Sequence, residues 1–547
     1  MRDKLTTARV TVTVFRQNHR HADRDAIPLR GYSLPKEPMS TSPVHLFLDL
    51  QAAVRRASEQ IIKRLILVLI AVAGTPHLHA ATWENATTQS VAPGFTPHTD
   101  FVHVRFGDSA GESLAMAGRD SAGNPWLGLI RMQDGQLDYR QMPLPDDAVG
   151  IDAGPAQDGS DALYVLTRRG VSVLRSFSGS LDRLVDSGSM YRGRSFAEIN
   201  SNLDFARALG ADNAPALLIP DLDVMHVFAG NDLSQLSEIE LPAVWRSFER
   251  AVTYRAAKVA SAPGALIAVR GDELLTFAAS QAGFSRSPRI LTLPLGLSNE
   301  REVEAFYNGY EDLDQSEIVL REPEVLEDIN GDGRPDLITL ETISKGVFDK
   351  SSTYRIHLAR EADHGVSFVA EPDTVLRSRG FQFGLRAVST GEGSSVLVSP
   401  GLRVGVRTVI GALFSRAVTL QIALFTADDS GKFDADASTV VKARIGFDFS
   451  SGQVELPTIE FGDFDGDGRK DLLLKLKGDK LVWRRNLGAG QFDDDDETLP
   501  LPAPANGTAV HTADMNGDGR DEIVARYARA DGDARRGQIS VLMVERP

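Results

Sequence analysis

The chain has 547 residues, no cysteine and a formal net charge of −16. A chain of this length forms several domains or one large repetitive fold rather than one small core. The absence of cysteine excludes disulfides, thiolate metal sites and cysteine nucleophiles, and the acidity argues against nucleic acid or an anionic membrane as a partner.

The first eighty residues differ from the rest of the chain. Lys63 and Arg64 precede an apolar run at 65–74, and small residues follow near Ala80. This order is typical of a secretory signal peptide, and the run is shorter than the roughly 20 residues that a transmembrane helix needs. We therefore expect residues 1–80 to be an N-terminal extension with a signal peptide, and Met39 is an alternative start. The protein would be exported, to the periplasm or the extracellular medium.

Removing this segment makes the remainder more acidic. Residues 1–80 hold 12 Lys or Arg and 6 Asp or Glu, so residues 81–547 carry a formal charge of −22. Divalent cations are natural partners of such a chain.

Residues 81–547 repeat one unit: an apolar strand, a polar turn with glycine, and then another apolar residue. The copies lie at 127–137, 171–181, 225–236, 274–284, 356–368, 422–433 and 481–492, and QISVLMVE near the C-terminus is a truncated eighth copy. The repetition predicts an all-β fold, a seven- or eight-bladed β-propeller of four-stranded antiparallel blades. If the ring closes by strand exchange, the strand missing after the last copy comes from near the start of this region.

Three stretches share one acidic pattern of nine positions. Oxygen-bearing side chains stand at positions 1, 3, 5 and 9, glycine stands at position 6, and arginine stands at position 7. The residues at positions 1, 3, 5, 7 and 9 are Asp328, Asn330, Asp332, Arg334 and Asp336 in the first stretch, Asp463, Asp465, Asp467, Arg469 and Asp471 in the second, and Asp514, Asn516, Asp518, Arg520 and Glu522 in the third.

This spacing predicts a calcium-binding loop. Carboxylate and amide oxygens at positions 1, 3, 5 and 9, with the backbone carbonyl of position 7, suit Ca²⁺, which offsets the repulsion between the acids. An EF-hand also needs a glutamate at position 12 and flanking helices, but position 12 is Thr339, Leu474 or Ala525, and the exits are strand-like. We expect about three calcium sites in loops between β-strands, and no other cofactor.

Phe461 and Gly462, followed by DFDGDGRKDLLL and later by NLGAGQF, resemble the FG-GAP or VCBS repeats of integrin α-subunit propellers and of many exported bacterial proteins. The resemblance is strong over about 320–547. It is weak over 96–300, where the acidic loops have decayed to GADNAPALLIPD and AQDGSDALYVL. It implies a calcium-rigidified propeller used for recognition or adhesion outside the cell, and it does not imply catalysis.

Two other readings remain open. Gly107, Ser109 and Gly111 match the GxSxG nucleophile elbow of a serine esterase, but no βα alternation follows them. Sugar-stacking platforms on a propeller face could be formed by Trp83, Trp126, Trp245 and Trp483, although the place of Trp483 in a repeat strand favours core packing. Such platforms would make the chain a glycan-binding or glycan-active protein, but no carboxylate pair is evident. Arg270-Gly271-Asp272 matches an adhesion tripeptide, but its setting between two apolar runs favours a hairpin turn.

The sequence therefore favours a binding, adhesion or structural module rather than an enzyme, with no catalytic residue assigned. Its ligand would be a protein or a glycan, and we expect a monomer without a membrane span once the signal is removed.

Overall fold

The structure is a computed structural model that describes residues 86–543, with its longest internal gaps at 187–198, 300–317 and 403–416 and with further short gaps between 157 and 490. The chain divides into two units, Met1–Met39 and Ser40–Pro547, and all described residues belong to the second. The predicted extension and signal peptide at 1–80, with the alternative start at Met39, lie outside the described residues. No helix within the described part is long and apolar enough to cross a membrane.

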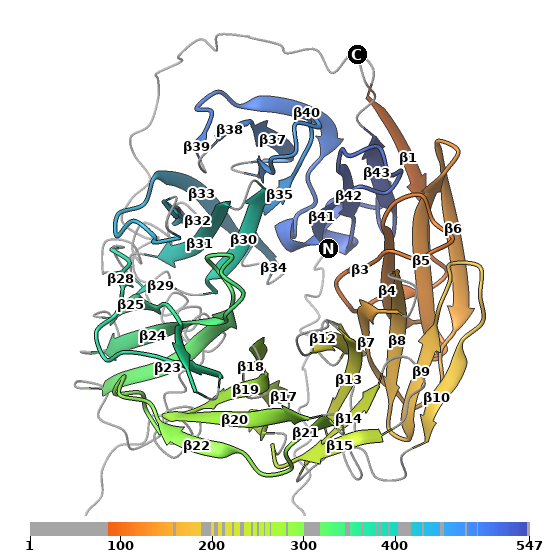
Figure 1. Ribbon diagram of the computed structural model, residues 1–547. Helices are drawn as coiled ribbons and strands as arrows, with labels where there is room; N and C mark the ends of the chain where they lie inside the picture. Colours follow the sequence, from red (N-terminus) through yellow and green to blue (C-terminus); the bar gives the residue numbers. More distant parts are fainter. Residues whose placement is uncertain are drawn as a thin grey trace, which may run out of the picture. The chain divides into compact units, whose positions relative to one another are not determined.

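The second unit is nearly all β, and its small sheets form an eight-bladed β-propeller ring (Figure 1). The fold class is confirmed, and eight is the larger of the two predicted blade numbers. The pairings between the named strands are antiparallel except for a short parallel contact between β11 and β7. Two isolated bridges, Arg377 with Asp436 and Leu456 with Asn506, are also parallel. In the described ranges the helical elements are two 3₁₀ turns, η1 (Gly507–Ala509) and η2 (Arg529–Asp531).

The first four blades occupy residues 96–292. Blade 1 contains β2 (Thr96–Pro97), β3 (Val102–Val104), β4 (Ser113–Arg119), β5 (Pro125–Gln133) and β6 (Gln136–Pro143). Blade 2 contains β7 (Ala148–Pro155), β8 (Asp161–Thr167), β9 (Gly170–Leu174), β10 (Asp182–Asp186) and β11 (Asn200–Ser201). Blade 3 contains β12 (Ala206–Leu209), β13 (Ala214–Pro220), β14 (Met225–Ala229) and β15 (Gln235–Ile239), and blade 4 contains β18 (Lys258–Ala262), β19 (Ala265–Arg270), β20 (Glu273–Ser280), β21 (Gly283–Phe284) and β22 (Arg289–Thr292).

The remaining blades follow in order. Blade 5 contains β23 (Ile318–Glu327), β24 (Asp336–Ser344), β25 (Lys350–His357) and β28 (Thr374–Val375). Blade 6 contains β29 (Phe381–Gln382), β30 (Arg386–Gly391), β31 (Ser394–Leu402), β32 (Ala417–Thr426), β33 (Thr439–Asp448) and β34 (Gln453–Glu455). Blade 7 contains β35 (Ile459–Gly462), β36 (Asp471–Leu474), β37 (Lys480–Arg484) and β40 (Glu497–Pro502), and blade 8 contains β41 (Val510–Ala513), β42 (Glu522–Arg526), β43 (Ile539–Met543) and β1 (Thr87–Val91). Separate hairpins are β16 (Val244–Phe248) with β17 (Ala251–Arg255), β26 (Arg360–Ala362) with β27 (Gly365–Ser367), and β38 (Asn486–Gly488) with β39 (Gln491–Phe492).

Strand exchange completes the last blade. The N-terminal strand β1 pairs antiparallel with β43, from Thr87 opposite Met543 to Val91 opposite Ile539, and the hydroxyls of Ser90 and Ser540 lie 2.7 Å apart. This pairing confirms the prediction that the strand missing from the last repeat comes from the start of the propeller region. It also covers a sheet edge that would otherwise be open.

The hydrophobic core lies between adjacent blades. One cluster joins Phe464, Leu473 and Trp483 of blade 7 to Ile523 and Leu542 of blade 8. Strand β36 is buried at all four positions because a blade covers each of its faces. A strand buried on both faces reads as a continuous apolar run rather than an alternating one. This explains why the acidic stretch at 463–471 changes at once into leucines.

Candidate metal centres

The three acidic stretches form loops between the first two long strands of their blades. Loop 1 (328–336) joins β23 to β24, loop 2 (463–471) joins β35 to β36, and loop 3 (514–522) joins β41 to β42. In each loop the residue at position 9 is also the first residue of the strand that follows. The predicted strand exits are confirmed, and an EF-hand is excluded.

The aspartate at position 1 holds each loop around its own carboxylate. In loop 2, Asp463 Oδ1 accepts hydrogen bonds from the backbone N–H groups of Gly466 and Asp467 at 2.7 and 3.1 Å, and Oδ2 accepts from Gly468 at 2.7 Å. The equivalent bonds in loops 1 and 3 lie between 2.7 and 3.1 Å. The sequence therefore encodes one local geometry three times.

Glycines at positions 4 and 6 make this geometry accessible. Their φ angles run from 76° to 85° in all three loops; in loop 2 they are 77° at Gly466 and 85° at Gly468. A residue with a Cβ is strained in that region. Sequence reasoning assigned the bend to position 6 alone and missed position 4, although glycine recurs there as Gly331, Gly466 and Gly517.

The acid at position 9 is the least solvated acid of each loop. Asp336, Asp471 and Glu522 have exposed fractions of 0%, 0% and 1%. Each accepts the backbone N–H of position 2, at 3.3, 3.2 and 2.7 Å.

Burial, reinforced by neighbouring loop carboxylates, raises the pKa of these acids. The pKa is raised to about 7 for Asp336 and Asp471 and to about 8 for Glu522. The ionised form of each acid is therefore poorly solvated, and a nearby cation would stabilise it.

Loop 2 brings three carboxylates together. One oxygen from each of Asp463, Asp465 and Asp471 lies within 4.8 Å of the others, and among the described residues this is the one His, Cys, Asp or Glu group with that arrangement. Loops 1 and 3 carry an asparagine at position 3, whose amide oxygen is also a suitable calcium ligand. The donor set of all three loops thus fits a hard divalent cation.

The residues at positions 5 and 7 contact each other. Asp332, Asp467 and Asp518 each accept the backbone N–H of the arginine two residues later at 2.9 Å. In loop 1 the other oxygen of Asp332 is also ion-paired with the guanidinium of Arg334 at 2.7 Å, and Asp467 is paired with Arg469 in the same way. The backbone N–H of the arginine at position 7, and in loops 1 and 2 also its guanidinium, thus contact the aspartate at position 5. The oxygen that position 7 would supply to a cation is its backbone carbonyl.

One part of the chain is similar to a known family of repeats. Residues 463–525, which span loops 2 and 3, match the model of an FG-GAP-like repeat. No curated protein matches the sequence.

Similar solved structures include AofleA from Arthrobotrys oligospora, which is 10% identical, with 77% of this chain and 94% of that chain covered and a TM-score of 0.26. A triple mutant of the same protein has the same identity and coverage and a TM-score of 0.28. A protein named as a candidate gluconolactonase is 12% identical, with 58% of this chain and 89% of that chain covered and a TM-score of 0.23. At these scores the likenesses carry no argument about function.

The sequence features of the other readings lie in turns. Ser109 lies between β3 and β4, so a strand follows it where a nucleophile elbow has a helix, and its Oγ is 3.2 Å from Ser113 Oγ. Gly271 and Asp272 form the turn between β19 and β20, as the turn reading predicts, and Arg270, the last residue of β19, is ion-paired with Glu273 at 2.7 Å.

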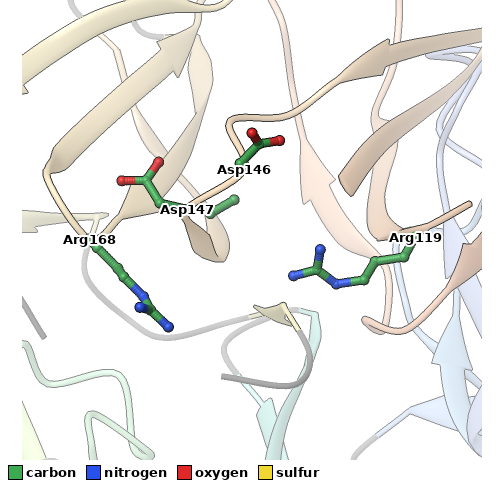
Figure 2. Close-up of a pocket in the computed structure, with 5 residues that line it drawn as sticks. Arg119, Asp146, Asp147 and Arg168 are labelled. Carbon is green, nitrogen blue, oxygen red and sulfur yellow. The ribbon is translucent and has the colours of Figure 1, made fainter. Parts of the chain in front are cut away.

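A small pocket lies near blades 1 and 2. Its volume is about 230 Å³, and Arg119, Asp146, Asp147, Ala148 and Arg168 line it. Figure 2 shows both guanidinium groups and both carboxylates around one space. Because two positive and two negative side chains share the lining, the pocket favours neither an anion nor a cation.

Proposed function

We propose that this protein is an exported calcium-binding β-propeller that acts as a binding, adhesion or structural module. The observation that carries the proposal is the threefold recurrence of one loop geometry, each copy with a buried acid at position 9. The ligands would be the side chains at positions 1, 3, 5 and 9 and the carbonyl oxygens of Arg334, Arg469 and Arg520. The match to an FG-GAP-like repeat over loops 2 and 3 supports the same assignment.

Calcium would have a structural role in these loops. A bound ion offsets the mutual repulsion of the loop acids and lets the buried acid at position 9 ionise. Because position 9 begins a strand, the ion would fix the loop to the start of that strand. No catalytic residue forms part of the proposal.

The loops favour calcium over magnesium for a geometric reason. Calcium accepts six to eight oxygen ligands at flexible angles, whereas magnesium needs a near-octahedral site and retains several waters. Five protein oxygens from a nine-residue loop suit the former. Extracellular calcium modules bind with dissociation constants of roughly 0.1–1 mM, which agrees with the predicted export.

The partner would be a protein or a glycan recognised by surface loops, and the acidic surface argues against nucleic acid. We propose a monomer with no membrane span after signal removal. The hydrolase and glycan-active alternatives gain no specific support from the described residues.

Calorimetric titration of the purified full chain with calcium tests the metal proposal. We expect about three sites with sub-millimolar to millimolar dissociation constants, and a melting temperature that falls when calcium is removed. Protein and glycan arrays probed in millimolar calcium, and again after its removal, test the binding role. A chain that neither binds calcium nor changes its melting temperature would refute the proposal.

A further inference from the structure

Loops 2 and 3 are joined by a reciprocal pair of hydrogen bonds. Asp521, at position 8 of loop 3, accepts the backbone N–H of Asp463 through Oδ2 at 2.8 Å, and its own N–H donates to the carbonyl oxygen of Asp463 at 2.8 Å. Asp463 is position 1 of loop 2, and Asp521 is covalently bonded to Glu522, which is position 9 of loop 3. The bridge thus connects a candidate ligand of one site directly to the neighbour of a candidate ligand of the other.

A second contact brings the same loops together. A Cβ atom placed on Gly466 of loop 2 would lie 3.0 to 3.1 Å from side-chain atoms of Arg520 in loop 3. Loops 2 and 3 therefore approach each other at two points, Asp463 and Gly466.

The same reciprocal bridge joins blades 1 and 2, where a complete acidic loop is lacking. Asp161 accepts the backbone N–H of Arg105 at 3.1 Å, and its own N–H donates to the carbonyl oxygen of Arg105 at 2.8 Å. Ser160-Asp161-Ala162 aligns with Arg520-Asp521-Glu522, so alanine takes the place of the acid at position 9. The aspartate at position 8 therefore connects blades, and it does so without a metal ligand beside it.

Loops 1 and 2 cannot make this bridge. Position 8 of loop 2 is Lys470, whose backbone N–H donates to the carbonyl oxygen of Thr390 at 3.0 Å but whose side chain has no acceptor. Position 8 of loop 1 is Pro335, which has no N–H to donate. Of the three loops, loop 3 alone has the residue needed to reach back to its neighbour.

We propose that Asp521 is a positioning residue that couples calcium binding in loops 2 and 3, so that occupation of either loop raises the affinity of the other, whereas loop 1 binds independently. The proposal rests on the calcium function proposed above. Binding at loop 3 fixes Glu522 and with it Asp521, which then holds the backbone of Asp463 in place. The first ion orders the contact that the two loops share and bears the loss of conformational entropy. The second ion then binds to loops that are already ordered, so it binds more tightly.

Terbium, a luminescent substitute for calcium, can report on loop 2 because Trp483 lies beside that loop. The ring centroids of Trp483 and Phe464, which is position 2 of loop 2, are 5.9 Å apart. Excitation of Trp483 sensitises terbium in loop 2, and the Trp483→Phe variant identifies this signal. The titration would be done on the full chain as wild type and as the variants Asp521→Ala, Asp521→Asn, Glu522→Gln and Asp161→Ala.

We expect Asp521→Ala to weaken terbium binding at loop 2 by at least about fivefold, the lower end of common coupling strengths. Asp521→Asn keeps an acceptor oxygen and should restore most of the affinity. Glu522→Gln should weaken loop 2 although the substitution lies in loop 3. Asp161→Ala removes the side-chain bond of the matched bridge between blades 1 and 2, as Asp521→Ala does between loops 2 and 3, and should leave the isotherm unchanged.

Different results would overturn different conclusions. Unchanged affinity at loop 2 in Asp521→Ala, with a native circular dichroism spectrum, would refute the coupling and leave the calcium function intact. Equal weakening by Asp161→Ala would show a general effect of blade contacts and would also refute the coupling. Failure of the wild type to bind calcium by calorimetry would refute the proposed function itself.

Discussion

Without a cation, the protein should lose stability as the pH rises from 5.5 to 8. Asp336 and Asp471 have pKa values raised from 3.8 to about 7, and Glu522 has a pKa raised from 4.5 to about 8. An acid whose pKa is higher in the folded state favours folding while it is protonated. The contribution is complete below the unfolded pKa, near 4, and is lost progressively until the pH has passed the folded pKa, near 7 to 8.

The magnitude follows from the shifts. A shift of about three pKa units corresponds to about 4 kcal/mol per group over the whole window from pH 4 to 8, and about half of this, about 2 kcal/mol, falls between pH 5.5 and 8. Three such groups change the free energy of unfolding by about 6 kcal/mol, which is comparable with the total stability of many domains. Bound calcium should remove most of this loss, so its stabilising effect should be far larger at pH 8 than at pH 5.5.

The assay is thermal unfolding at pH 5.5 and 8.0, with metal-free protein from a chelating resin and with protein in millimolar calcium. The matched control combines Asp336→Asn, Asp471→Asn and Glu522→Gln, which keep the shape of the three buried acids and remove their charge. This variant should show a flatter pH dependence and little response to calcium. A metal-free wild type as stable at pH 8 as at pH 5.5, or an equal gain from calcium at both pH values, would show that the three buried acids do not destabilise the metal-free fold.

Three further predictions concern the loops, the blade interfaces and the ring closure. Gly466→Ala should lower the free energy of unfolding, measured with urea, by about 1 kcal/mol or more, because Gly466 has a positive φ and lies close to Arg520. Gly468 has a similar φ but no atom within 4 Å of an added Cβ, so Gly468→Ala should lower the free energy of unfolding by less. The reverse order would contradict the contact between Gly466 and Arg520. Leu473→Ala should cost about 2–5 kcal/mol by the same method, because this fully buried side chain packs between blades 7 and 8, and a loss below 1 kcal/mol would argue against that core. A chain that begins at residue 92 lacks β1 and should melt at a lower temperature and aggregate more than one that begins at 81, whereas equal behaviour would show that β1 does not close the ring.

The part of the fold that the sequence predicted is encoded by local interactions. In each acidic loop, backbone N–H groups three to five residues after position 1 donate hydrogen bonds to the carboxylate at that position, as they do to Asp463 in loop 2. The signature of the loop therefore lies in nine consecutive residues. The strand that completes blade 8 was predictable because the last repeat lacked one. The number of blades stayed between seven and eight because the decayed repeats at 96–300 carry no loop signature to count.

Contacts between blades were not predictable from the sequence. In the sequence, Asp521 is one of several acids in an acidic stretch, and its hydrogen-bond partner Asp463 lies 58 residues away. Nothing local distinguishes an aspartate that bridges two loops from one that faces solvent. The burial of the acids at position 9 was also hidden, since it depends on neighbouring blades that cover β24, β36 and β42.

Anomalous diffraction from crystals grown in calcium would locate the ions in the three loops. We expect one calcium peak inside each of loops 1, 2 and 3, within about 2.3–2.6 Å of oxygens from the acids at positions 1 and 9. Well-ordered loops without anomalous density at saturating calcium would contradict this expectation.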